Sequence, residues 1–187
     1  MIILIHNFGY QSVKTFVDEI KKSEKLIVII NDYKEKTFPK NINTVPLKEF
    51  TPEVIAKKVK TIASKANENI GCVTFDENLV ELCGLLNDMF SKRNEKCLRT
   101  RTSYLLTDKL MMRTFLSNSV KQPDFAEYHG LENAKKFLDK HPYGIVLKPR
   151  VLYSGKGQYY INSKEDFNYV PVNLNHYLKE INFLLNQ

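Results

Sequence analysis

The chain has 187 residues, a net charge of +7 at neutral pH, 43% hydrophobic residues and 26% charged residues. This is the composition of a globular protein with room for one large domain or two small ones, and no apolar run reaches the length of a membrane span. The positive charge permits a polyanionic partner. However, the lysines are scattered and no recognition-helix, zinc or RNP pattern accompanies them, so we do not expect nucleic-acid binding.

The N-terminus and the cysteines were inspected for targeting, metal-binding and redox patterns. Residues 1–6 are apolar but lack the basic region and long apolar core of a secretory signal, so they are better interpreted as a first β-strand. A cytoplasmic location follows as the default expectation. The three cysteines, Cys72, Cys83 and Cys97, have no metal-ligand or redox spacing, and we expect Cys72 and Cys83 to be buried thiols.

The first half of the chain has a β-α-β order. Residues 1–6 and 26–30 are near-continuous apolar runs, as expected for parallel strands covered on both faces, and residues 12–22 between them have helical spacing. A Rossmann dinucleotide site is excluded, because the first turn contains one glycine, Gly9, where the fingerprint requires three. The turn remains a candidate for substrate contact, since ligands collect at the carboxyl ends of such strands.

Further elements complete a predicted first domain. Thr51 and Pro52 form a helix start, as N-cap and first helical residue. The polar, basic stretch 91–103 is interpreted as the passage to a second domain, which gives domains at 1–100 and 101–187. The other elements predicted in this half are a short strand at 44–47, a strand at 70–74 and a helix at 78–90.

The second half opens with a helix start at Thr107 and Asp108, where Thr107 is the predicted N-cap. Lys109 then opposes the dipole of the first helical turn, and a phosphate held nearby would relieve that conflict. Residues 174–181 have helical spacing, and 183–185 fit either a longer helix or a final strand. The other predicted elements are a strand at 123–126, a helix at 131–140 and a capping-box helix start at 163–166.

Residues 141–161 read as a strand, a small-residue loop and a second strand. The first strand ends in Lys148, Pro149 and Arg150, and the loop carries the sequence SGKG at 154–157. A glycine-containing turn lets backbone N–H groups converge on a phosphate, and the flanking cations supply the opposing charge. The alternative is an ordinary surface hairpin with lysines in its turn.

Three segments together resemble the N-terminal half of an ATP-grasp ligase. Among these enzymes, they are most similar to carbamoyl-phosphate-synthase-like and amino-acid-ligase members. They are residues 73–82, residues 107–113 followed by 120–125, and residues 145–150 with the SGKG loop. The resemblance implies an α/β fold: a Rossmann-like pre-ATP-grasp domain with a parallel sheet, followed by the small α+β ATP-grasp lobe. It also implies a reaction in which ATP activates a small carboxylate as an acyl phosphate, which an amine or another nucleophile attacks.

The resemblance assigns ATP-binding residues in the second domain. Lys109 and Lys148 would bind the ATP phosphates, and the loop 154–157 would close over them. Arg150 and Lys156 would be auxiliary cations, and no catalytic or metal-binding residue is assigned. The full set of expected ATP-binding residues is Lys109, Lys148, Arg150, Ser154, Gly155, Lys156 and Gly157.

Two departures from the family pattern shape the functional prediction. Val151, Leu152 and Tyr153 fill the first half of a loop that is usually richer in glycine, which predicts weak ATP binding. Residues 181–187 resemble the start of a hinge strand, and the lobe that would bring the Mg²⁺-binding carboxylates does not follow. We therefore expect a fragment of a ligase that is inactive alone, or a non-catalytic binding protein derived from the same fold. The sequence indicates neither the substrates nor an oligomeric state.

Overall fold

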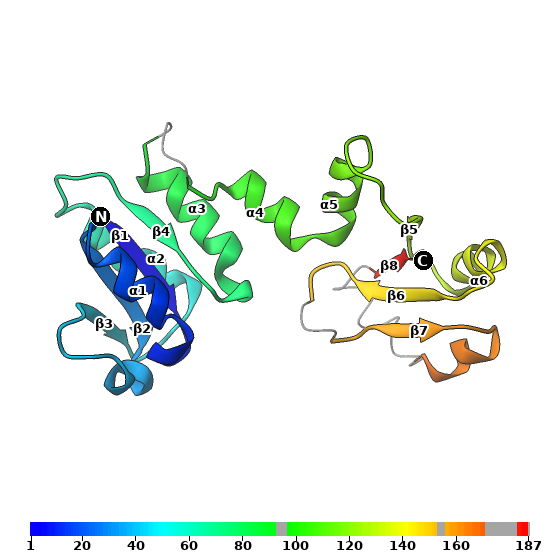
Figure 1. Cartoon of the computed structure of the whole chain (residues 1–187), viewed down its shortest axis with the longest axis horizontal. Coiled ribbons are helices and arrows are strands. Elements are labelled where there is room, and N and C mark those ends of the chain that lie inside the picture. The colour runs from blue at the N-terminus through cyan, green and yellow to red at the C-terminus, as the bar shows by residue number, and fades with distance from the viewer. Residues whose placement is uncertain (93–96, 153–155, 171–182, 187) are drawn as a thin grey trace. The chain divides into compact units, whose positions relative to one another are not determined.

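The structure is a computed structural model that describes residues 1–92, 97–152, 156–170 and 183–186 (Figure 1). The chain divides into two compact units, Met1–Ser103 and Tyr104–Gln187. Within the ranges described, no helix combines the length and apolar character needed to cross a membrane.

The first unit contains a four-stranded parallel sheet. Its strands are β1 (Ile2–His6), β2 (Leu26–Asn31), β3 (Thr44–Leu47) and β4 (Gly71–Val73), in the order β3-β2-β1-β4. The chain adds β2 and β3 on one side of β1 and then crosses to place β4 on the other side. The predicted parallel sheet is confirmed, and the reversal of strand order lies between β1 and β4.

Helices cover both faces of this sheet. Leu4 points to the side of α1 (Lys14–Ile20), while Ile3 packs on the opposite side with α2 (Pro52–Ala63) and α3 (Val80–Phe90). This alternation follows from the two-residue period of a strand. The three predicted helices are confirmed. The predicted start of α2 is also confirmed, because the Thr51 hydroxyl accepts a hydrogen bond from a main-chain N–H in the first turn.

Helix α4 (Thr100–Thr107), which the sequence did not predict, begins within the polar passage at 91–103, and the two compact units divide after Ser103. Short 3-10 helices complete this half of the chain: η1 (Tyr10–Ser12), η2 (Asp32–Thr37) and η3 (Glu77–Leu79).

Asn87 and the two buried cysteines have structural roles in this unit. The Asn87 side chain, fully buried on α3, accepts from the Cys72 N–H at 2.6 Å and donates to the carbonyls of Cys72 and Leu98, each at 2.9 Å. Cys72 and Cys83 are buried, as predicted. Burial raises the pKa of the Cys72 thiol to about 12, so it is protonated and unreactive at neutral pH.

The second unit contains an antiparallel sheet of four strands in the order β5-β8-β6-β7. They are β5 (Phe125–Glu127), β6 (Ile145–Pro149), β7 (Tyr159–Ile161) and β8 (Phe183–Asn186). The predicted strand-loop-strand is confirmed as the β6–β7 hairpin. The segment at 183–185, left open between helix and strand, forms β8.

Helix α6 (Leu131–Lys140) and the 3-10 helix η4 (Glu165–Tyr169) contribute to a hydrophobic core on one face of this sheet. Leu147 lies in that core, whereas Lys148 alternates to the other face. The sequence predicted α6 with its observed bounds. The predicted helix start at 163–166 gives only the 3-10 helix η4, and the predicted helical segment at 174–181 lies outside the described residues.

Candidate functional site

The candidate site begins at the N-terminus of α5 (Lys109–Leu116). Asp108 is the N-cap of this helix, and its Oδ1 accepts hydrogen bonds from the N–H groups of Leu110 at 2.9 Å and Met111 at 3.1 Å. The predicted N-cap, Thr107, was wrong by one residue, because Thr107 is the last residue of α4. The carboxylate rather than the hydroxyl therefore satisfies the first N–H groups of α5.

Arg150, directly after β6, holds Asp108 with its planar guanidinium. Its Nε lies 3.1 Å and 3.0 Å from the two Asp108 carboxylate oxygens, and its Nη2 also donates to Asp108. Its Nη1 donates to Glu127 Oε1 at 2.9 Å. The Arg150 side chain is 17% exposed and the Asp108 side chain 12%. We call this cluster, Asp108–Arg150–Glu127, the carboxylate clamp.

The carboxylate clamp changes the ionisation of its members. Burial alone would raise the pKa of Asp108, but the hydrogen bonds from Arg150 and from two main-chain N–H groups outweigh it and lower the pKa below its ordinary value. The hydrogen bond to Asp108 raises the pKa of Arg150 further. Both groups are therefore charged across the physiological pH range.

A main-chain connection joins the same two segments. The Lys109 N–H donates to the Arg150 carbonyl at 3.0 Å. The Lys109 ammonium donates to that carbonyl at 3.3 Å and also to the carbonyl of Leu152. Lys109 and Arg150, which are 41 residues apart, are thus brought together, and the Lys109 ammonium lies at the beginning of the predicted phosphate loop.

Lys148 lies on the sheet face opposite the hydrophobic core. It is half-buried, and no partner for its ammonium occurs among the residues that the structure describes. Lys148 and Glu127 both pair with the same position of β8, Leu184, so they lie in one row across the sheet. Lys148 and Arg150 are two positions apart, with Pro149 between them, so the two-residue period of an extended chain directs both side chains to the same side.

The loop between β6 and β7 is described only at its ends. Ser154 and Gly155 lie outside the described residues, and Lys156 is exposed in the turn that leads to β7. Gly157 has φ of +67°, and a Cβ built there would lie 3.0 Å from Pro149 Cγ. The return of the loop over the end of β6 therefore requires glycine at this position.

The site can hold anionic groups through ammonium charges. Arg150 is the exception among the predicted cations, because two carboxylates already neutralise its guanidinium. Lys109, Lys148 and Lys156 remain as candidates for phosphate contact. In the described ranges no group of three or more His, Cys, Asp and Glu residues is arranged to hold a metal ion.

Sequence reasoning missed two members of the site. Asp108 was recognised as a helix-start residue but not as the partner of Arg150, and Glu127 gave no signal. Charge pairs across 42 and 23 residues depend on how the strands and helices are arranged, so no local pattern could identify them.

The carboxyl edge of the parallel sheet in the first unit contains a second group of polar side chains. His6 Nε2 lies 2.8 Å from Ser12 Oγ, which in turn donates to the Gly9 carbonyl at 2.7 Å. Because the hydroxyl proton goes to Gly9, His6 Nε2 is the donor and Nδ1 carries a lone pair. Burial lowers the pKa of His6, although the negative charge of Asp76 opposes this, so the ring is uncharged at neutral pH.

Several buried acceptors at this edge lack partners. His6 Nδ1, Asn7 Oδ1 and Asn31 Oδ1 are buried without a hydrogen-bond partner in the described part of the chain. Asn7 follows β1 and Asn31 ends β2, so both stand where ligands collect in parallel sheets. The Gly9 turn, predicted as a place for substrate contact, belongs to the same edge.

No family model and no curated protein matches the sequence. Solved structures do match in fold. The L-amino acid ligase of Bacillus licheniformis has 18% identity and a TM-score of 0.68, with 100% of this chain and 43% of that chain covered. The N5-carboxyaminoimidazole synthetase of Staphylococcus aureus, complexed with ADP, has 17% identity and a TM-score of 0.68, with 99% and 47% covered.

A third match is the biotin carboxylase domain of the Hydrogenobacter thermophilus 2-oxoglutarate carboxylase, in complex with MgADP, ADP and bicarbonate. It has 14% identity and a TM-score of 0.73, with 99% of this chain and 43% of that chain covered. These proteins are ATP-grasp ligases. The chain has the α/β fold of their N-terminal portion and spans less than half their length.

Proposed function

We propose that this chain is the N-terminal, nucleotide-binding portion of an ATP-dependent ligase that activates a small carboxylate as an acyl phosphate for attack by an amine or a similar nucleophile. One observation carries the proposal. The connection between α5 and β6 places the Lys109 ammonium at the start of the loop that follows Lys148. The likeness to ligases solved with ADP supports a nucleotide as the ligand.

In this proposal the polyphosphate lies over the face of the second sheet opposite its hydrophobic core. Lys148 projects from β6 on that face, and the loop between β6 and β7 contributes backbone N–H groups and Lys156. Arg150 positions α5 through Asp108 rather than binding phosphate. Mg²⁺ would neutralise the polyphosphate, but the described residues contain no fitting cluster, so no step is assigned to it.

The unpartnered acceptors of the first unit could bind a ligase substrate other than the nucleotide. His6 Nδ1 and the Asn7 and Asn31 amides would bind a ligand that carries N–H or O–H donors. We therefore propose that the carboxyl edge of the parallel sheet receives a substrate of the same ligase, as either the carboxylic acid or its nucleophile.

The test is ATP and ADP titration of the 187-residue protein by calorimetry, with Lys148→Ala as the variant. Loss of one charge-assisted contact to phosphate should weaken binding by roughly tenfold or more, with an unchanged melting temperature. Lys136→Ala, an exposed lysine on α6, is the matched control and should bind as the unchanged protein does. Equal affinity of the Lys148→Ala and control variants would refute the assignment of Lys148.

A non-catalytic binding protein is the second candidate, and one observation favours it. The Lys109 ammonium already donates to two main-chain carbonyls, so phosphate must compete with them for this cation. If the unchanged protein binds neither ATP nor ADP at millimolar concentration, the second candidate is preferred.

A further inference from the structure

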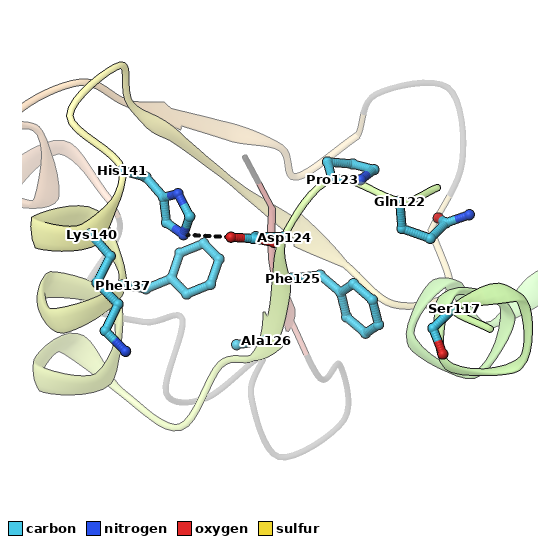
Figure 2. A pocket seen from close by; sticks show the side chains of 9 residues that line it. All are labelled: Ser117, Gln122, Pro123, Asp124, Phe125, Ala126, Phe137, Lys140 and His141. Atoms are coloured by element: carbon cyan, nitrogen blue, oxygen red, sulfur yellow. Dashed lines mark ion pairs between the residues drawn. The ribbon is translucent and has the colours of Figure 1, made fainter. Parts of the chain in front are cut away.

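The two units differ in how their buried polar groups are satisfied. In the second unit a pocket of about 520 Å³ lies beside β5, and Figure 2 shows the His141 ring next to the Asp124 carboxylate. In the described part of the chain, no residue that lines this pocket has a buried polar side-chain atom without a partner. In the first unit, His6 Nδ1 is such an atom. It costs free energy in the isolated protein, and a ligand that donates a hydrogen bond to it would recover that cost.

His6 ends β1 at the carboxyl edge of the parallel sheet and is only 1% exposed. Its Nε2 donates to Ser12 Oγ at 2.8 Å, which leaves the lone pair of Nδ1 as an acceptor. The Phe8 ring packs on the imidazole, with 5.6 Å between the ring centroids, and Phe8 is itself 51% exposed. Because half of Phe8 faces solvent, its ring can change rotamer rapidly, and this movement would open the imidazole to a ligand.

A second exposed aromatic ring follows the neighbouring strand. Phe75 comes after β4, which pairs with β1 where the strand order reverses, and it is 56% exposed. Its ring packs edge-on against Phe16 of α1, with 5.1 Å between the centroids. His6 also points to the α1 side, because it shares the strand period of Leu4, which packs in the core on that side. The exposed rings of Phe8 and Phe75 therefore lie with His6 on one face of the sheet, at the edge where ligands collect.

The charge beside these rings is negative. Asp76 is buried directly after Phe75, and its Oδ1 accepts hydrogen bonds from the main-chain N–H and the side-chain amide of Asn78, each at 3.0 Å. Burial lowers the pKa of His6, and the charge of Asp76 opposes this only in part, so His6 is an uncharged acceptor beside a carboxylate. The faces of aromatic rings also attract cations. We call His6, Phe8, Phe75 and Asp76 the His6 corner, and its features together favour a positively charged donor over an anion.

We propose that the His6 corner binds a primary ammonium group carried on an alkyl chain. The ammonium donates to His6 Nδ1, lies in the field of Asp76 and contacts the faces of Phe8 and Phe75, while the chain packs on the same rings. An α-amino acid suits the corner less well, because its carboxylate would meet the like charge of Asp76. In the ligase proposed above, this cation is the amine nucleophile and not the carboxylic acid. That identification rests on the proposed function, whereas the binding itself does not.

The test is an amide-resolved NMR titration of the 187-residue protein with pentylammonium. Amide signals at 6–9 and 74–76 should shift and saturate, with a dissociation constant of about 10 mM or tighter. Three probes change one property each: pentanol lacks the charge, pentyltrimethylammonium lacks the N–H donors, and L-norleucine adds a carboxylate to the same chain. Each should bind at least about fivefold more weakly than pentylammonium.

Phe8→Leu and Phe75→Leu are the decisive variants, because both rings are exposed and leucine keeps an apolar side chain at each position. Each should weaken pentylammonium binding about threefold or more, because it removes a contact between the cation and an aromatic face. Tyr143→Leu is the matched control. It removes an exposed aromatic ring from the second unit and should leave pentylammonium binding unchanged.

The proposal is overturned if pentylammonium shifts no signal in these segments, or if any of the three probes binds as tightly as pentylammonium. It is equally overturned if neither phenylalanine variant weakens binding. ATP titration of the same protein reports separately on the proposed ligase. Pentylammonium binding without ATP binding would support the site but refute the role of the cation as a ligase nucleophile, whereas ATP binding without pentylammonium binding would refute the site alone.

Discussion

Replacing Arg150 with methionine tests whether the carboxylate clamp attaches α5 to β6. Methionine keeps much of the apolar stem but removes every contact of the guanidinium with Asp108 and Glu127. The change leaves the Asp108 carboxylate largely buried and without its cation. The main-chain bond from Lys109 to residue 150 does not depend on the side chain and should persist.

The magnitude follows from the burial of the pair. Removing one partner of a fully buried ion pair costs about 3–5 kcal/mol. Asp108 and Arg150 retain 12% and 17% exposure, and two N–H groups of α5 still bind Asp108, so we expect a smaller loss of about 2 kcal/mol. Arg150→Lys keeps the positive charge but lacks the planar guanidinium. Its free energy of unfolding should therefore lie between that of the unchanged protein and that of Arg150→Met.

The pH dependence has a defined sign. The folded-state pKa of Asp108 lies below its ordinary value of 3.8. Its contribution to stability is therefore complete above that value and is lost as the pH falls through the folded-state pKa. In Arg150→Met, burial acts on Asp108 without the opposing arginine, so the loss of stability should begin at a higher pH than in the unchanged protein.

Amide hydrogen exchange resolved by residue is the assay. A loss of about 2 kcal/mol in the second unit should speed exchange of the most protected α5 and β6 amides about thirtyfold. Amides of β1 and β2 belong to the first unit and serve as an internal control that should not change. Unaltered exchange in α5 and β6 would show that the clamp does not hold these elements together.

Two further substitutions test single features of the fold. Asn87→Ala should lower the free energy of unfolding of the first unit by about 3 kcal/mol, measured by urea unfolding, because it leaves the buried main-chain groups of Cys72 and Leu98 unsatisfied; an unchanged midpoint would contradict this. Gly157→Ala should destabilise the β6–β7 hairpin by about 1 kcal/mol, because an L-residue is strained at positive φ and its Cβ approaches Pro149. Hairpin amides that exchange as slowly as before would argue against that strain.

The sequence predicted elements whose pattern is local and strong. The bounds of α6 and the Thr51–Pro52 start of α2 were predictable, because periodicity and capping act within a few residues. Helix α4 was missed because its buried contact uses small residues. Ser103 is fully buried, and a Cβ added at Gly84 would lie 2.7 Å from the Ser103 hydroxyl. A helix that packs through such small residues shows no periodic pattern of hydrophobic residues in the sequence, so α4 could not be recognised from periodicity.

The candidate site was predictable only in part, because local patterns select single residues but do not show which distant residues they contact. Lys109 and Lys148 were selected from local context and from the family resemblance, and the structure places the Lys109 ammonium at the start of the loop that follows Lys148's strand. The partners of Arg150 depend on β5 and α5 meeting the end of β6, which only the tertiary fold decides. The assignment of these residues to ATP remains a prediction.

The structure offsets the unfavourable interaction between Lys109 and the helix dipole in a different way from the one that the sequence suggested. A lysine in the first turn of a helix opposes the dipole, and a phosphate would relieve this. Here the Lys109 ammonium instead meets the carbonyls of Arg150 and Leu152, whose partial negative charges offset the unfavourable position without a ligand. A nucleotide would therefore meet Lys148 first and gain Lys109 only by displacing these carbonyls. Because Arg150 fixes both segments, Arg150→Met should also change ATP affinity although its guanidinium does not contact phosphate in our proposal, which links the stability of the clamp to nucleotide binding.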